Sequence, residues 1–287
     1  MKSSKTIAII DIGSNSIRYF TAQSTKHGVS FSDKLRCTTR LAAGLVQSGL
    51  LQAEPIINSY RAISGFCELA RAGGLPVYAY ATSAVRDAKN RDEFLSLIKP
   101  LGMNVSVLSG PEEGHYAYLA ACPNGGSLID IGGGSTQLVT CDSAISYPVG
   151  CVRARDYCPA NEYPKMKDTL FAWFSSIFDR STPLPAPIVG VGGTISTLGA
   201  LLLGQKSYDG TMFGNFSFSA EMLDELLNNL CAMGDNIKDN PLLVKRHDVI
   251  IQGGLIVLYL MNTFDIASIR PSEVDGMEGF AINKLAE

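Results

Sequence analysis

The stretches DIGSNS at residues 11–16 and DIGGGS at residues 130–135 decide the fold of this chain. Each begins at the Asp that ends a predicted strand, residues 6–11 in the first case and 127–130 in the second. A strand, a turn of Gly and Ser, and a returning strand together indicate a β-hairpin. Two unrelated hairpins could share such a turn, but the common Asp-Ile-Gly and the closing Ser favour two related lobes. We therefore predict an α/β chain whose two lobes each begin with this hairpin.

The composition is typical of a globular chain with two hydrophobic cores. Its 287 residues, 46% of them hydrophobic, exceed the roughly 250 at which single cores stop growing. A net charge of −3 argues against binding nucleic acid by bulk positive charge, but it allows an anion to be held locally. The seven cysteines form no CxxC pair, and no apolar run reaches the roughly 18 residues of a membrane-spanning helix. We expect a cytoplasmic protein without a membrane or nucleic-acid partner.

A third glycine-rich segment, GVGGT at residues 190–194, follows a predicted strand and precedes a helix predicted at 195–203. Backbone N–H groups in such turns bind phosphate oxygens, and a helix N-terminus adds a partial positive charge. The segment lacks the Lys of a P-loop, and no GxGxxG motif occurs, so neither a Walker NTPase nor a dinucleotide fold is indicated. Three such turns predict a cleft for a chain of phosphates, with Arg18, Arg86 and Arg246 supplying positive charge.

Five short phrases occur in order: DIGSNSIR at 11–18, ATSAVR at 81–86, SGPEE at 109–113, DIGGGST at 130–136 and GGT at 192–194. Together they resemble the exopolyphosphatase/guanosine-pentaphosphate phosphohydrolase (Ppx/GppA) family. The resemblance implies a two-lobed actin/Hsp70/sugar-kinase-like (ribonuclease H-like) α/β fold with a substrate cleft between the lobes. We expect the short two-domain form, with lobes at 1–118 and 119–287 and a terminal helix that can pack back on the first lobe. Larger members of the family carry additional C-terminal helical domains.

The resemblance also implies an activity: Mg²⁺-dependent hydrolysis of the terminal phosphoanhydride of inorganic polyphosphate, with release of orthophosphate. In the family the second Glu of the SGPEE phrase is the base for the attacking water, which corresponds to Glu113. The Asp of DIGGGS, here Asp130, assists the metal or the water, and Asp11 and Asp130 are the expected metal residues. The family usually has Glu directly after GGGST, where this chain has Gln137. An amide is neither a base nor an anionic ligand, so Gln137 is either a weak metal residue that lowers turnover or a harmless variant.

The expected phosphate-binding residues lie in the three turns and on the arginines. They are Gly13, Ser14, Asn15, Ser16, Arg18, Arg86, Gly132, Gly133, Gly134, Ser135, Thr136, Gly192, Gly193, Thr194 and Arg246. Two alternative functions stay open. One is hydrolysis of guanosine pentaphosphate, and the other is a polyphosphate- or alarmone-binding regulator that has lost turnover, which Gln137 would favour. A sugar or acetate kinase of the same fold matches the phrases less well. The residues leave open the chain-length preference, the identity of the metal and the oligomeric state, a homodimer included.

Overall fold

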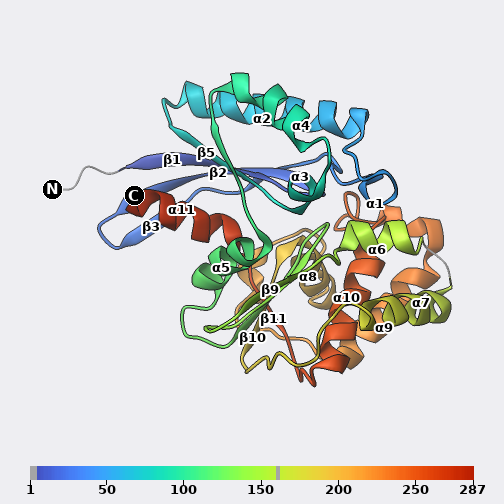
Figure 1. Ribbon diagram of the computed structural model, residues 1–287. Coiled ribbons are helices and arrows are strands. Elements are labelled where there is room, and N and C mark those ends of the chain that lie inside the picture. The colour runs from blue at the N-terminus through green and yellow to red at the C-terminus, as the bar shows by residue number, and fades with distance from the viewer. Residues whose placement is uncertain (1–4, 160–161) are drawn as a thin grey trace.

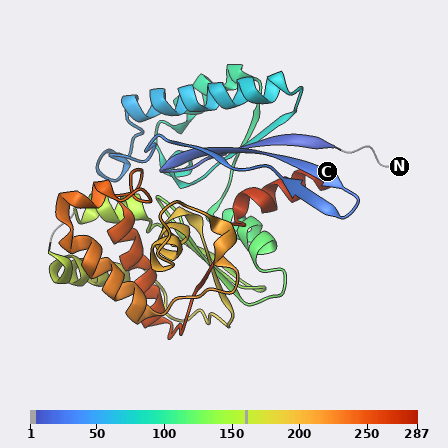
Figure 2. The ribbon, with the colours of Figure 1, turned by 180° about the vertical axis from the view of Figure 1, so that it is seen from behind.

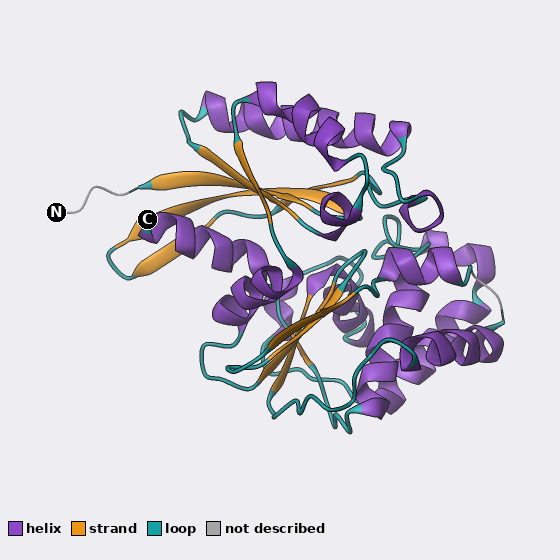
Figure 3. Cartoon of the chain, viewed as in Figure 1, coloured by secondary structure: helices purple, strands orange, loops and turns teal. Residues whose placement is uncertain are grey.

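The computed structural model describes residues 5–159 and 162–287, which form two α/β lobes, one above the other in Figure 1. Each lobe contains one central sheet with helices packed against it (Figure 3). None of the helices in these two ranges combines the length and the apolar composition needed to cross a membrane.

The first lobe is built on a six-stranded sheet with the order β3-β2-β1-β5-β6, in which β4 also pairs with β2. Strands β1 and β2 are antiparallel, whereas β5 runs parallel to β1 and β6 runs parallel to β5. The strands are β1 (Thr6–Ile12), β2 (Ser16–Thr25), β3 (Gly28–Phe31), β4 (Leu35–Thr38), β5 (Val77–Ala81) and β6 (Asn104–Val107). The helices are α1 (Leu45–Ser48), α2 (Ala53–Ala72), α3 (Ser83–Asp87) and α4 (Arg91–Ile98), with a short 3-10 turn at Lys99–Leu101.

Strand β1 is buried from Ile7 to Ile12 because helices cover both faces of its sheet. Alternate side chains of a strand point to opposite faces. Ile10 packs into the cluster that contains Ile63 of α2, whereas Ile9 packs into the cluster that contains Phe280 of α11 (Gly276–Ala286). The first-lobe core therefore includes residues from the far end of the chain.

The second lobe is built on a five-stranded sheet with the order β11-β10-β7-β8-β9. One face packs on α10, whose residues from Ile250 to Met261 are all buried, and the other face packs on α5. The strands are β7 (Ser127–Ile131), β8 (Thr136–Val139), β9 (Ala144–Tyr147), β10 (Ile188–Val191) and β11 (Arg270–Pro271). The helices are α5 (Gly110–Ala121), α6 (Cys151–Tyr157), α7 (Tyr163–Ser175), α8 (Gly192–Leu202), α9 (Ala220–Ala232) and α10 (Ile250–Thr263), with 3-10 turns at Gly210–Phe213 and Gly234–Asp239.

The two lobes begin with the same hairpin, as the repeated DIG stretch predicts. In the first, Asp11 pairs with Arg18, and the Gly13 N–H donates to the Ser16 carbonyl over 3.2 Å. In the second, Asp130 pairs with Gln137, and the Gly132 N–H donates to the Ser135 carbonyl over 2.9 Å. A parallel strand then joins each hairpin, β5 beside β1 and β10 beside β7. The hairpin turns consequently occupy equivalent places in the two lobes.

Two helices connect the lobes. Helix α11 follows the last strand of the second sheet but packs under the first sheet, against β1 and β2 (Figures 1 and 2). Helix α11 also packs along α5, which covers the second sheet. Because α5 runs from Gly110 to Ala121, the expected lobe boundary between residues 118 and 119 lies inside this helix. A Cβ atom on Gly279 of α11 would lie 1.9 Å from the Tyr116 carbonyl oxygen, and the two helices can approach this closely only because residue 279 is glycine. This contact fixes α11 against α5.

Candidate active site

A cavity of about 90 Å³ lies where the two hairpin turns face each other. Thirteen of the residues singled out in the sequence line it: Asp11, Gly13, Ser14, Asn15, Ser16, Arg18, Glu113, Asp130, Gly132, Gly133, Gly192, Gly193 and Arg246. Its wall also contains Ser83 of the ATSAVR phrase and residues to which no sequence pattern pointed, among them Arg36, Tyr80, Cys151 and Gly276. The fold thus gathers most of the predicted residues, from both lobes, around one small space.

The glycines of the second turn are required by close packing against the first turn. A Cβ atom on Gly133 would lie 2.7 Å from the Ser14 Cβ atom, and one on Gly134 would lie 2.6 Å from the Ser83 Oγ atom. Ser14 and Ser83 hydroxyls are themselves 2.8 Å apart and hydrogen-bonded. Any larger side chain in the second turn would push the turns apart and widen the cavity.

The third glycine segment differs from its prediction at the helix start. Helix α8 begins at Gly192 and not at residue 195, so the GGT phrase forms the first helical turn. Gly192 has a φ of +88°, a conformation that favours glycine, and its Cβ position would lie 2.8 Å from Oδ1 of Asp130. The N-terminus of α8 consequently lies directly beside this carboxylate.

Five predicted phosphate-binding residues and Gln137 lie just outside the cavity lining. The five phosphate-binding residues are Arg86, Gly134, Ser135, Thr136 and Thr194. The Thr136 hydroxyl is buried and donates to the Val149 carbonyl over 2.6 Å, and the Ser135 hydroxyl accepts from Gln137 Nε2 over 2.9 Å. Arg86 donates to the Leu108 carbonyl over 2.9 Å. These contacts support the turns from behind.

Glu113, the predicted base, projects from the first turn of α5. Arg86 Nη1 and Gln137 Nε2 both approach its Oε2 atom, over 3.4 Å and 3.3 Å. Among the described residues no donor reaches Oε1, so one oxygen is held and the other is free. Burial, with the nearby Asp130 carboxylate, raises the pKa of Glu113 to about 8 against the opposing effect of Arg86. A carboxyl group with a pKa in this range can exchange a proton near neutral pH.

Asp11 and Asp130 are the two carboxylates that could hold a metal ion. Asp11 Oδ2 is paired with Arg18, whereas Asp11 Oδ1 is buried without a hydrogen-bond partner. Burial raises the pKa of both groups, that of Asp130 to about 7. Within the described parts of the chain no group of three or more Asp, Glu, His or Cys is placed to hold a metal. Two carboxylate oxygens fit Mg²⁺, which usually takes one or two carboxylates and fills its shell with water and phosphate oxygens.

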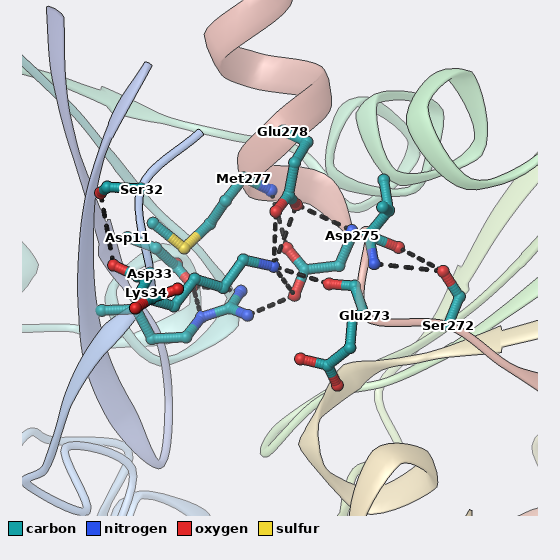
Figure 4. Close-up of polar contacts among 11 residues, drawn as sticks. Asp11, Ser32, Asp33, Lys34, Ser272, Glu273, Asp275, Met277 and Glu278 are labelled. Carbon is teal, nitrogen blue, oxygen red and sulfur yellow. Dashed lines mark hydrogen bonds and ion pairs between the residues drawn. The ribbon is translucent and has the colours of Figure 1, made fainter. Parts of the chain in front are cut away.

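Arg18 is held between two carboxylates, which sequence inspection did not reveal. Its Nε atom donates to Asp11 Oδ2 over 2.7 Å, and its Nη1 atom donates to Oδ2 of Asp275. Lys34 lies on the far side of Asp275 and also pairs with Glu278 (Figure 4). The sequence around Asp275 contains only a capping-box pattern, DGME at residues 275–278, which indicates a helix start and gives no sign of a contact with Arg18.

Two other arginines at the cavity have no carboxylate partner. Among the described residues, the guanidinium groups of Arg36 and Arg246 make no hydrogen bond or ion pair, and both residues line the cavity. Burial, together with the neighbouring Arg36, lowers the pKa of Arg246 to about 10. The Arg246 guanidinium lies over Gly193, where a Cβ atom would be 1.7 Å from Nη2. Unpaired cations at the mouth of a small polar cavity favour an anionic ligand.

Known proteins resemble this chain over nearly its whole length. A family model described as the Ppx/GppA phosphatase family matches residues 8–287. Exopolyphosphatase 2 of Mycobacterium tuberculosis is 27% identical in an alignment 315 residues long, gaps included. The alignment covers 96% of this chain and 98% of that protein. The crystal structure of the Ppx/GppA family member of Aquifex aeolicus has a TM-score of 0.81 at 27% identity, covering 99% of this chain and 98% of its own. An exopolyphosphatase of Cytophaga hutchinsonii, at 18% identity, shares the fold with a TM-score of 0.86 over 98% of both chains. The family resemblance and the two-lobed α/β fold class are confirmed.

Proposed function

Since the chain belongs to the Ppx/GppA phosphatase family, we propose that it hydrolyses the terminal phosphoanhydride of inorganic polyphosphate and releases orthophosphate. The observation that carries this proposal is one cavity that contains a held carboxylate base, two carboxylates suited to a metal and two unpaired arginines. Glu113 is the base, Asp11 and Asp130 are the metal residues, and Arg36 and Arg246 are the cations. This set matches the needs of phosphoryl transfer, which depends on positioning and on charge stabilisation.

In the proposed reaction the terminal phosphate occupies the cavity between the two hairpin turns. The N–H groups of Gly13 and Gly132 are used within the turns, so those of Ser14, Asn15 and Gly133 bind its oxygens, and Arg246 offsets negative charge on the phosphates that follow. Glu113 accepts a proton through its free Oε1 atom from a water molecule that attacks the terminal phosphorus. The new P–O bond forms as the bridging P–O bond breaks, the leaving oxygen stays on the shortened chain, and orthophosphate is released.

Asp11 and Asp130 would hold Mg²⁺ through the unpaired Oδ1 of Asp11 and the carboxylate of Asp130. When bound, the ion would offset charge at the terminal phosphoryl group. Burial raises the pKa of both carboxyls, so binding of Mg²⁺ would be accompanied by loss of the protons that they hold without it.

A second substrate, guanosine pentaphosphate, is favoured by a groove that adjoins the cavity. The groove has a volume of about 840 Å³ and shares Arg36 and Arg246 with the cavity, and its lining includes the exposed side chains of Tyr208 and Val244. A phosphate chain has no apolar surface to bury on these side chains, whereas a nucleoside has. The groove also contains Lys206 and Lys245, which suit the distal phosphates of either substrate.

The alternative of a regulator without turnover rests on Gln137. Gln137 lies outside the cavity lining and its amide donates to Glu113, so its lack of charge leaves both proposed metal residues in place. This placement supports an active enzyme, and a cytoplasmic setting suits either substrate.

The test is orthophosphate release from polyphosphates of defined length and from guanosine pentaphosphate, each with Mg²⁺ and with a chelator. We expect Mg²⁺-dependent release from polyphosphate. Tight binding of polyphosphate with no release in any Mg²⁺ concentration would instead establish the regulator. Release from guanosine pentaphosphate alone would make the nucleotide the substrate.

A further inference from the structure

Asp275 occupies the centre of a buried chain of alternating charges that starts at the cavity (Figure 4). Arg18 bridges Asp11 and Asp275, and Lys34 lies 3.3 Å from Asp275 Oδ2 and 2.8 Å from Glu278 Oε1. Asp275 is 6% exposed, so these pairs are shielded from water. Nothing in the sequence motifs or in the proposed mechanism uses this residue.

Both oxygens of Asp275 are already engaged within the protein. Oδ1 accepts the backbone N–H of Met277 over 2.9 Å, because Asp275 is the N-cap of α11. Oδ2 accepts from Arg18 and pairs with Lys34. Asp275 is therefore linked to Asp11 through Arg18.

Arg18 contacts only one of the two carboxylate oxygens of Asp11. Nε and Nη2 of Arg18 both approach the same oxygen, Asp11 Oδ2, over 2.7 Å and 2.6 Å, and Asp11 Oδ1 is left buried and unpaired. An arginine beside a single carboxylate frequently forms two parallel bonds, one to each oxygen. Here Asp275 draws Nη1 the other way, and the guanidinium reaches one oxygen only.

We propose, on the premise of the metal-dependent function above, that Asp275 is a positioning residue that anchors Arg18 and thereby keeps Asp11 Oδ1 free to bind Mg²⁺. Without the Asp275 carboxylate, Arg18 can pair with both oxygens of Asp11 and compete with the cation. Outer-shell partners of metal-binding carboxylates act in this way, and their loss typically lowers metal affinity about 10–100-fold.

The anchor is rigid because α11 is fixed at both its cap and its contact with α5. The Asp275 N–H donates to Glu278 Oε2 over 2.9 Å, which completes a capping box, and Gly279 packs directly on the backbone of Tyr116. Helix α5 also carries Glu113. One helix pair thus positions both the base and the anchor of Arg18.

The test compares two substitutions that each remove one negative charge and keep the capping box. Asp275→Asn retains an N-cap side chain, and Glu278→Gln retains the acceptor for the Asp275 N–H. Binding of Mg²⁺ alone to the full chain is measured by titration calorimetry. We expect Asp275→Asn to weaken binding about 10–100-fold and Glu278→Gln to leave it nearly unchanged. If Asp275→Asn does not fold, Asp275→Ser, which also caps a helix, takes its place.

A double-mutant cycle tests whether the effect passes through Arg18. In an Arg18→Gln background, Asp275→Asn is expected to cause no further change in Mg²⁺ affinity, because the anchored group is gone. The proposal is overturned by unchanged Mg²⁺ binding in Asp275→Asn, by an equal loss in Glu278→Gln, by a full effect in the Arg18→Gln background, or by a wild-type chain that binds no Mg²⁺. Orthophosphate release by the wild-type chain is measured separately. Its absence would count against the proposed function, while the metal titrations would still decide the role of Asp275.

Discussion

The amide nitrogen of Gln137 donates to Oε2 of Glu113 over 3.3 Å, from a side chain that is completely buried behind the cavity. The same amide reaches the hydroxyls of Ser135 and Ser146, over 2.9 Å and 3.2 Å. Gln137 lies on β8, opposite Asp130 in the hairpin. This residue, which departs from the family pattern, is therefore a hydrogen-bond donor to the proposed base.

Gln137→Glu tests this relationship. The change removes the donor and buries a second carboxyl group beside Glu113, so we expect lower thermal stability that decreases further as the pH rises and the new group ionises. Differential scanning calorimetry between pH 5 and pH 9 measures it. Gln137→Met, which loses the donor without adding charge, is the control and should show a loss of stability without the pH dependence. Tighter Mg²⁺ binding in Gln137→Glu would instead make residue 137 a metal ligand.

Glu113→Gln tests the assignment of the base. An amide cannot accept the proton of the attacking water, and the loss of a general base typically lowers the rate about 10²–10⁴-fold. The matched control is Glu112→Gln on the same helix turn, because Glu112 is exposed and a Gln retains its capping contact with Ser109. We expect orthophosphate release to fall in the first variant and to persist in the second. Equal turnover in both variants would remove Glu113 from the mechanism.

The pKa of Glu113 predicts two opposite pH dependences. The base must be ionised, so kcat/KM is expected to rise with pH through the region near 8. The stability of the metal-free chain should instead fall as the pH rises. The folded state keeps the Glu113 proton between the ordinary pKa of 4.5 and about 8, so the free energy of unfolding decreases as pH rises across that window. Glu113→Gln should remove this part of the slope, which urea titrations at several pH values can measure.

Arg246→Ala tests the role of the unpaired cations. Charge-assisted hydrogen bonds contribute about 1.5–3 kcal/mol, so we expect KM for polyphosphate to rise roughly 10- to 100-fold. Arg246 has no ion-pair partner in the described parts of the chain, and its removal should therefore leave the ligand-free melting temperature unchanged or raise it. Arg91→Ala is the control, because Arg91 is an exposed residue of α4 far from the cavity lining. A similar KM in both variants would contradict a contact between Arg246 and the substrate.

Gly279→Ala tests the contact between α11 and α5. The new Cβ atom would lie 1.9 Å from the Tyr116 carbonyl oxygen, and overpacking of this kind typically costs about 1–3 kcal/mol. Gly65→Ala in α2 is the matched control, since nothing lies within 4 Å of its Cβ position and the change should stabilise the helix by about 0.5–1 kcal/mol. Urea unfolding of both variants measures the difference. A neutral Gly279→Ala would show that the helices separate at little cost.

The sequence predicts the parts of this site that are encoded locally. The two hairpin turns could be recognised because an Asp at a strand end and the small residues after it specify a turn within six positions, at residues 11–16 and 130–135. The phosphate roles assigned to the turn residues stay predictions, as does that of Arg86, whose side chain contacts Leu108, Asp87 and Glu113.

The contacts that depend on tertiary structure could not be predicted in the same way. Asp275 lies 257 positions from Arg18, and no local pattern indicates that the two meet. Arg36 faces the cavity only because β4 pairs with β2 in a register that places it opposite Arg18. Helix α8 begins at Gly192 because glycine can adopt the positive φ found there, a choice that apolar periodicity does not reveal.

The return of α11 to the first lobe also determines the order in which the protein can fold during its synthesis. Met277, Phe280 and Ala281 complete a core that otherwise consists of residues near the start of the chain, such as Ile7, Ile9 and Phe20. A ribosome must therefore translate the entire second lobe before one face of the first sheet is covered. Until then that apolar face remains available to chaperones and to other nascent chains. Burial of this face and the contact between Arg18 and Asp275 both require α11, so neither can form before the second lobe has been synthesised.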